Sequence, residues 1–289
     1  MGAASALVPA LIGHHLTHIP GFTTGIYFAA MSLGVAIAAG TAVQLDLLLG
    51  GWRPVLATWG ASAGVTAALW FVLTPALRRT TNKVPVTGTL DVDRRLPWRS
   101  RTAWWVTAYS AVQMTIGFSG LAWITPLYVS LGLSAQEAAN RFAVFQVVVV
   151  VTLLALAPLT DRVHDRRPLL AVMTLITMAG IAIVLVDPVG LSVVAMCCFG
   201  AGIGGGGALG LVLILDVTES QGDAARVGAM VLLVSFICGA IGPVLLGLLR
   251  DVTGGFTVGF TVLLALAIAL LCSTGAQRPG RTIGHTDGS

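Results

Sequence analysis

Charged residues are what this sequence has least of. Asp, Glu, Lys and Arg together make up 10% of its 289 residues, whereas an ordinary soluble domain carries about 25%. With so few charged side chains, a soluble protein of this length could not cover its own surface with polar groups. The net charge of +4 is also small, so nucleic-acid binding is not expected.

Paired cysteines and catalytic motifs are missing as well. The four cysteines all lie in apolar runs, where cysteine behaves as a small hydrophobic residue, and without any CxxC spacing neither a disulfide nor a metal site is expected. The sequence has no Ser-His-Asp set, HExxH motif, paired carboxylates or phosphate-binding loop, so no enzyme activity and no cofactor are expected. Gly200–Gly205 has a dinucleotide-like glycine spacing, but it lies inside an apolar run with no preceding strand.

Long apolar segments dominate the chain instead. Hydrophobic residues make up 56% of it and the mean hydropathy is +0.91. A helix needs about 20 apolar residues to cross a hydrocarbon layer about 30 Å thick. Eight segments reach or approach that length: Phe22–Leu49, Val55–Leu77, Ala103–Tyr128, Ala138–Leu159, Leu169–Val186, Leu191–Leu215, Val227–Leu249 and Phe256–Cys272. Ala3–Ile12 is about half as long. We therefore predict an all-α polytopic membrane protein with eight full spans and one partial span.

A polar run, Arg78–Arg101, is the longest break between these segments. It holds seven of the sixteen basic residues, with three apolar segments before it and six after it. If it is cytoplasmic, the alternation of loops places thirteen basic residues inside and leaves only Arg53, Arg141 and Arg250 outside. This positive-inside bias predicts that residues 78–101 and the C-terminus face the cytoplasm, in a multi-pass protein of the plasma (inner) membrane.

A weak internal repeat indicates two related halves. Gly25 and Ser32 match Gly228 and Ser235 at an offset of 203 residues, and Gly50-Gly51-Trp52 matches Gly254-Gly255-Phe256 at an offset of 204. The period is six helices, as in parallel six-helix halves related by an axis along the membrane normal. We expect residues 1–77 to be the remainder of an N-terminal half, 78–101 a linker, 102–275 a complete C-terminal half and 276–289 a disordered tail. The N-terminal half would then lack three helices and part of a fourth, on the order of 100 residues.

The segment Asp161–Pro168 combines acids and arginines on the expected inner side. An acid at a helix end beside arginines can form charge-assisted bonds that latch one conformation and release in another. The alternative is a positive-inside loop with no further role. The gating candidates are Asp161, Arg162, Arg166 and Arg167. The segment resembles the cytoplasmic signature of the major facilitator superfamily, which follows the second helix of each half. It departs from that signature at Ala157, where a Gly is expected, and at His164–Asp165.

Further motifs narrow the resemblance. The chain is similar to the cyanate and nitroimidazole transporter family of that superfamily, over most of residues 1–275. The motifs are Thr24–Tyr27, Gly51–Arg53, Gln113, Trp123 with Pro126, Leu133–Ala135, Phe145-Gln146, Ala208–Leu211, Gly242-Pro243 and Asp251–Gly255. The resemblance implies a major facilitator helical bundle. It also implies secondary transport of a small anion or small polar solute by alternating access, with the proton as a candidate coupling ion.

Five side chains are candidates for contact with that solute. Gln113, Trp123 and Gln146 carry polar groups near the middle or end of apolar segments, where such groups need partners. Gln113 and Trp123 share a broad helix face with Gly117 and Gly120. For both glutamines the alternative is an interhelical hydrogen bond, and for Trp123 an interfacial anchor. The other two candidates are Tyr27, for which the alternative is core packing, and Arg141, for which the alternative is snorkelling to the outer interface.

Small residues mark the remaining features. Gly202, Gly206 and Gly210 recur every four positions, which lets another helix approach closely. Gly242 and Pro243 add a site for bending.

The expected partners are a small-molecule solute and the lipid bilayer. A different class remains open at this point: a membrane bundle that does not transport, or an inactive fragment of a transporter.

Overall fold

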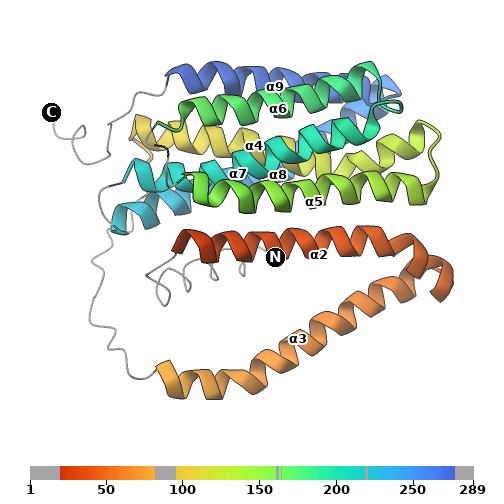
Figure 1. Cartoon of the computed structure of the whole chain (residues 1–289), viewed down its shortest axis with the longest axis horizontal. Helices are drawn as coiled ribbons and strands as arrows, with labels where there is room; N and C mark the ends of the chain where they lie inside the picture. The colour runs from red at the N-terminus through yellow and green to blue at the C-terminus, as the bar shows by residue number, and fades with distance from the viewer. Residues whose placement is uncertain (1–19, 82–95, 161–162, 164, 219–220, 277–289) are drawn as a thin grey trace. The chain divides into compact units, whose positions relative to one another are not determined.

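The computed structural model describes residues 20–81, 96–160, 163, 165–218 and 221–276. All regular elements in these residues are helices, because a chain in lipid must bond its backbone N–H and C=O groups internally. In chain order they are α2 (Pro20–Leu49), α3 (Trp52–Thr81), α4 (Arg101–Ser130), α5 (Ala135–Thr160), α6 (Arg167–Val186), α7 (Ser192–Asp216), α8 (Gln221–Thr253) and α9 (Thr257–Ala276) (Figure 1). The half-span expected at Ala3–Ile12 lies outside the described residues.

The helix bounds follow the predicted segments within a few residues, and local signals explain where helices begin. Ser100 precedes α4, and its hydroxyl accepts a hydrogen bond from the N–H of Ala103 at 3.3 Å, which satisfies one of the free donors of the first turn. Pro168 sits in the first turn of α6, where its missing N–H costs no helical bond.

Seven of the described helices are long and apolar enough to cross a membrane, namely α2, α3 and α5 to α9. The expected span Ala103–Tyr128 does form a long helix, α4, but it is not among the seven. Its hydroxyl, amide and indole side chains lower its hydropathy. Several of these groups are buried inside the helical bundle, including Thr107, Gln113 and Ser119. The low hydropathy of α4 therefore reflects its place inside the bundle, where neighbouring helices shield these polar side chains from lipid.

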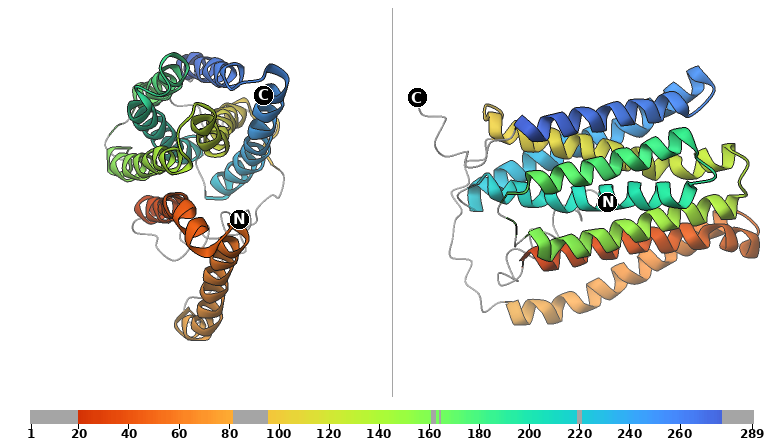
Figure 2. Two further views of the ribbon diagram at one scale, coloured as in Figure 1. Left: turned by 90° about the vertical axis from the view of Figure 1, so that its right-hand side faces the viewer. Right: turned by 45° about the horizontal axis from the view of Figure 1, so that its top comes forward.

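The chain divides into two compact units, residues 41–93 and residues 1–40 with 94–289. The helices α4 to α9 all belong to the second unit and form a bundle (Figure 2). Within it α4 runs beside α8, α5 runs beside α7, and α6 lies between α7 and α9. These helices cover the residues expected for a C-terminal half, while the division into halves stays a prediction.

Three hydrophobic clusters lie among the described residues of the bundle. A small one consists of Leu153, Leu156 and Ala208, and the two larger ones lie toward opposite ends. One contains Ile116, Tyr128, Phe145 and Phe199, and the other contains residues from the start of α4, the end of α7 and the start of α8. Val112 packs against both clusters. The next residue, the polar Gln113, therefore lies at a level between the two larger clusters.

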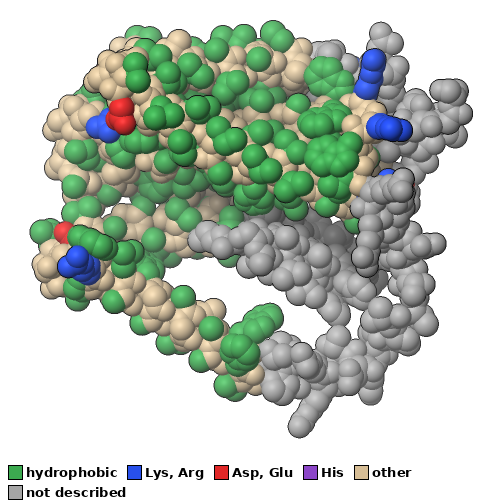
Figure 3. Space-filling model, turned by 180° about the vertical axis from the view of Figure 1, so that it is seen from behind, with side chains coloured by type: hydrophobic (Ala, Val, Ile, Leu, Met, Phe, Trp, Pro, Cys, Tyr) green, Lys and Arg blue, Asp and Glu red, His purple; other side chains and the backbone are tan. Residues whose placement is uncertain are grey.

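The outer surface of the bundle suits a lipid environment. Large apolar side chains on α5, α6 and α8 are about half exposed, for example Val151 at 59%, Leu175 at 49% and Val244 at 62%. Figure 3 shows hydrophobic side chains along the bundle, with charged ones at its ends. This is the distribution expected of helices whose long sides face hydrocarbon.

Three helix-to-helix turns among the described residues contain a glycine with positive φ, one of them being Gly132 in the α4–α5 turn with φ of 92°. The α2–α3 turn contains Gly50 and Gly51, with φ of 73° and 141°, and the α8–α9 turn contains Gly254, with φ of 73°. Gly50 donates its N–H to the carbonyl of Asp46 at 3.0 Å, and Gly254 donates to Arg250 at 2.8 Å. A residue with a Cβ is strained in this conformation.

Candidate functional site

Gln113 is the polar centre of the bundle. It lies about 18 Å along α4 from the start of the helix, and only 7% of it is exposed. Its Nε2 donates to the carbonyl of Gly202 at 3.2 Å and, more weakly, to that of Ile203 at 3.5 Å, both in α7. No acceptor bond to its Oε1 is found among the described residues. The Nε2 group of the amide is thus bonded to α7, and its Oε1 remains available as a hydrogen-bond acceptor.

Gly206 provides the space for this amide. A Cβ at position 206 would collide with the side chain of Gln113, lying 2.6 Å from its Cδ. One turn away, Tyr109 donates its hydroxyl to the carbonyl of Gly206 at 3.3 Å. Tyr109 was not among the expected site residues, although its spacing of four from Gln113 places both on one face of α4.

The glycines of α7 lie against three different helices. Gly200 and Gly204 face α5, where an added Cβ would lie 2.5 Å from the carbonyl oxygens of Phe145 and Val149 respectively. Gly202 faces α6, and a Cβ there would lie 2.6 Å from the backbone nitrogen of Thr177. Gly206 faces α4, and so does Gly210, whose added Cβ would be 3.6 Å from the Tyr109 ring. The glycine run thus places α7 in close contact with α4, α5 and α6.

Gln146 on α5 is 4% exposed, yet no hydrogen bond to it is found among the described residues. The described structure gives no bond between Gln146 and Gln113. The two glutamines that the sequence grouped together are therefore both buried, but only Gln113 has an identified interhelical partner.

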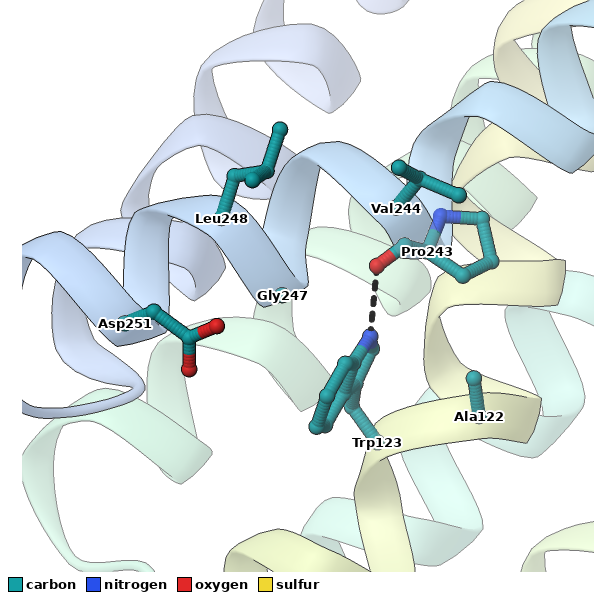
Figure 4. A pocket seen from close by; sticks show the side chains of 7 residues that line it. All are labelled: Ala122, Trp123, Pro243, Val244, Gly247, Leu248 and Asp251. Atoms are coloured by element: carbon teal, nitrogen blue, oxygen red, sulfur yellow. Dashed lines mark hydrogen bonds between the residues drawn. The ribbon is translucent and has the colours of Figure 1, made fainter.

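Trp123 links α4 to α8 near the C-terminal end of α4. Its indole N–H donates to the carbonyl of Pro243 at 2.8 Å. A shallow pocket of about 410 Å³ lies here, and Figure 4 shows the indole beside α8 with its bond to Pro243. The lining residues are Ala122, Trp123, Pro243, Val244, Gly247, Leu248 and Asp251. The pocket is mainly apolar, with one carboxylate.

A cation also stands over this indole. The guanidinium of Arg250 lies 5.8 Å from the Trp123 ring and 5.1 Å from the ring of Phe256, and the two rings are 5.6 Å apart. Such cation–π contacts contribute about 0.5–1 kcal/mol at exposed sites. Sequence reasoning placed Arg250 only as a residue of the outer side, because nothing in its local sequence indicates which ring it covers.

Nearby, Gly242 and Pro243 lie where α8 meets α4. A Cβ on Gly242 would lie 2.8 Å from the methyl carbon of Thr115 and 2.9 Å from the hydroxyl of Ser119. Pro243 is inside α8. Close approach at this glycine brings α4 near enough for the Trp123 bond to form.

Arg141 is already engaged within the bundle. Its Nε donates to the hydroxyl of Ser192 at 2.9 Å, linking the start of α5 to the start of α7. This contact favours a structural role for the Nε group, while the remaining guanidinium N–H groups can serve other acceptors. The side chain of Tyr27 lies outside the described residues.

The expected gating segment is described only in part. Asp161 and Arg162 lie outside the described residues. Arg166 forms an ion pair with Asp216 at the C-terminal end of α7, with 18% and 35% of the two side chains exposed. Arg167 begins α6, and its backbone N–H donates to the carboxylate of Asp165 at 3.1 Å. Asp216 was missed, although an acid at the inner end of an apolar segment is a natural partner for this loop.

Chemically, these groups can recognise a solute, but they do not form a reaction centre. No cluster of three His, Cys, Asp or Glu that could hold a metal ion occurs among the described residues. The buried polar groups are amides and hydroxyls, which donate and accept hydrogen bonds. The arginines and acids lie at helix ends.

The sequence of the chain matches a family model and several transporters. A family model described as Major Facilitator Superfamily matches residues 1–243. A Bacillus subtilis protein named as an uncharacterized transporter is 27% identical over 268 residues, which are 92% of this chain and 65% of that protein. The 2-nitroimidazole transporter of Escherichia coli is 26% identical, over 93% of this chain and 68% of that protein. The cyanate transport protein of the same organism is 25% identical, over 95% and 70%.

The fold comparison agrees with these matches. The structure of the Escherichia coli fucose:proton symporter superposes with a TM-score of 0.65 at 18% identity, covering 95% of this chain and 72% of that one. A second structure of that symporter, in the outward conformation, gives a TM-score of 0.63. The fold is therefore shared, while the chain spans about two thirds of the length of the curated relatives it matches.

Proposed function

The chain belongs to the Major Facilitator Superfamily, a family of membrane transporters and not of enzymes, and from this premise we propose that it takes part in secondary active transport of a small anion or small polar organic solute. Cyanate-like and nitroimidazole-like solutes are the favoured classes, because two relatives are named for such substrates. Transport would follow alternating access about a site near the bilayer midplane. The proton is the proposed coupling ion. The protein would lie in the plasma membrane with residues 78–101 and the C-terminus in the cytoplasm.

The observation that carries this proposal is the state of Gln113. Its Nε2 is held by carbonyls of α7, so the orientation of the amide is fixed and its Oε1 is left as an acceptor. A fixed acceptor in a mostly apolar bundle can select a solute that donates a hydrogen bond, because the alternative for either group is an unpaired polar atom in a low-dielectric medium.

The other proposed solute contacts have different support. Gln146 is buried without an identified partner, and Trp123 lines the pocket. Arg141 retains N–H groups beyond its bond to Ser192. Tyr27 is supported by sequence alone. All four remain proposed contacts.

Gating is proposed for the arginine-rich segment after α5. The ion pair between Arg166 and Asp216 supports a role in holding the α5–α6 loop against α7. A pair of this kind, partly exposed at the mouth of the bundle, is weak enough to open and close during a transport cycle. Asp161, Arg162 and Arg167 are the further members of this proposed latch.

Uptake by the reconstituted chain tests the proposal. Proteoliposomes would be given labelled cyanate or 2-nitroimidazole, with and without an imposed pH gradient, and accumulation would be measured. We expect accumulation by the wild type and at least a tenfold loss in Gln113→Ala. The matched control is Gln136→Ala, since Gln136 is an amide on α5 that bonds only the neighbouring Asn140 among described residues. Equal uptake by both variants would remove Gln113 from the site.

A second candidate is a membrane bundle that does not transport by itself. It is favoured by one observation, that the pocket at Trp123 is shallow and mainly apolar, whereas a transported polar solute needs an enclosed site with polar groups. A folded, monodisperse protein that accumulates neither solute under any gradient would support this alternative and contradict transport by the chain alone.

A further inference from the structure

The start of α4 exposes an unusual group of side chains. Trp98, Trp104 and Trp105 are 46%, 41% and 42% exposed, and Arg99 and Arg101 between them are exposed too. We call these five residues the Trp–Arg surface. Three of the chain's seven tryptophans thus lie within eight residues, at the junction between the basic linker and the bundle.

Local bonds hold this surface in shape. The indole N–H of Trp104 donates to the carbonyl of Trp98 at 2.8 Å, and the two rings are 5.7 Å apart with a 48° tilt. The turn before the helix is closed by the N–H of Ser100, which donates to the carbonyl of Pro97 at 3.1 Å. The chain segment that carries both arginines is therefore fixed against the first turn of α4.

The two arginines of this surface differ from others in the chain. Arg53 lies over the ring of Trp52 at 5.2 Å, and Arg250 lies over Trp123 and Phe256. Arg166 and Arg226 are in ion pairs. No ion pair or ring contact of Arg99 or Arg101 occurs within the described residues. Their positive charge is thus directed outward, beside exposed indoles.

We propose that the Trp–Arg surface binds the headgroups of anionic phospholipids. Indole rings favour the boundary between hydrocarbon and water, because one end is apolar and the other donates a hydrogen bond. Arginine matches phosphate in geometry and charge, and basic groups beside a membrane span attract anionic lipid. The surface lies at an end of the bundle, where charged side chains gather in Figure 3. In the proposed orientation it faces the inner leaflet.

Two other occupants, a transported solute and a soluble protein partner, fit this surface less well than anionic lipid. A transported solute is proposed to bind inside the bundle at the buried Gln113, whereas the Trp–Arg surface is exposed. A soluble protein partner would not require indoles at the point where a span enters the membrane. Binding of the lipid does not depend on transport, so the proposal stands apart from the proposed function.

Lipid titration of the purified full chain tests this. Native mass spectrometry would measure the dissociation constants of phosphatidylglycerol and phosphatidylcholine. We expect the Arg99→Gln/Arg101→Gln variant to bind phosphatidylglycerol about 25-fold more weakly, at about fivefold for each arginine, with phosphatidylcholine unchanged. Arg99→Lys/Arg101→Lys should remain within about threefold of the wild type, since lysine keeps the charge.

Arg53→Gln is the matched control, because it removes one arginine beside an exposed tryptophan at the other proposed membrane face. It should leave phosphatidylglycerol binding unchanged, and equal loss in this control would overturn the assignment. The wild type alone gives an independent test: 0.5 M salt should abolish its preference for phosphatidylglycerol, and a preference that survives overturns the proposal. Competition by water-soluble glycerol phosphate as strong as by the lipid would also overturn it, in favour of a simple anion site.

Discussion

Gly50 and Gly254 lie 204 residues apart and share a backbone φ of 73°. Each donates its N–H to the carbonyl four residues earlier, Gly50 to Asp46 and Gly254 to Arg250. Both also end a helix that is followed directly by another, α2 before α3 and α8 before α9. The sequence repeat that pairs these glycines is therefore accompanied by a repeated turn geometry, while the period of six helices stays a prediction.

The shared geometry predicts equal sensitivity to a side chain. Gly50→Ala and Gly254→Ala should each lower the free energy of unfolding by about 1 kcal/mol, because an L-residue with a Cβ is strained in the left-handed region. Gly228→Ala in α8 is the control, since an added Cβ there meets nothing within 4 Å and alanine favours a helix. Thermal unfolding in detergent measures all three. A neutral Gly254→Ala would contradict the role of the turn.

The positions of the helices could be predicted from the sequence, because a span is defined by its apolar length and by the polar residues and glycines that end it. The segment Leu169–Val186, for example, lies wholly within α6 (Arg167–Val186). In the structure Gly202 lies against α6, and Gly206 and Gly210 lie against α4, while a role of these glycines in packing or bending during transport stays a prediction. The positions of the gating residues Asp161 and Arg162 lie outside the described residues and stay untested.

Partners of individual side chains were much harder to predict. A helix such as α9 is apolar on every face, so its periodicity does not reveal which face meets which neighbour. The bond from Gln113 to α7 and the pair between Arg166 and Asp216 both depend on how helices are rotated about their axes. That rotation is set by packing across residues about 50 to 90 positions apart, which no local pattern records.

Gly206 should be more sensitive to substitution than its neighbour Gly207. A Cβ at 206 would displace the amide of Gln113, whereas one at 207 meets nothing within 4 Å. Because overpacking costs about 1–3 kcal/mol, Gly206→Ala should weaken solute binding at least tenfold, while Gly207→Ala leaves it unchanged. Binding of labelled solute to the purified chain measures this. Equal affinity in the two variants would mean that the position of the Gln113 amide does not matter for the solute.

The ion pair between Arg166 and Asp216 should control rate more than stability. Both side chains are partly exposed, so Asp216→Asn should change the free energy of unfolding by less than about 1 kcal/mol. Solute exchange across proteoliposomes should slow or accelerate severalfold, because the latch between the α5–α6 loop and α7 is lost. The charge swap Arg166→Asp/Asp216→Arg should recover part of the rate.

Asp223→Asn is the control for this latch, because Asp223 pairs with Arg226 at 3.5 Å, three residues along its own helix α8. Its exchange rate should match that of the wild type. If Asp223→Asn and Asp216→Asn alter exchange equally, the effect is one of net charge at the bundle mouth, and the specific latch is wrong.

Trp123→Phe separates two roles of this indole. The substitution keeps an aromatic ring near Phe256 and Arg250 but removes the N–H that bonds Pro243 at 2.8 Å. Loss of one hydrogen bond should lower the free energy of unfolding by about 1 kcal/mol. If the indole also borders the solute path, as proposed, affinity for the solute should fall severalfold. A role as anchor alone predicts the first change without the second.

Two further variants decide between these outcomes. Gly247→Ala places a Cβ 3.0 Å from Cζ2 of Trp123, so it shifts the ring while the indole N–H remains available, and a solute-facing ring predicts lower affinity here too. Trp105→Phe removes an indole N–H at the opposite end of α4 and should affect neither stability nor affinity by more than about 0.5 kcal/mol. If Trp123→Phe and Gly247→Ala both lower thermal stability but leave solute binding at the wild-type level, Trp123 holds α4 to α8 and does not touch the solute.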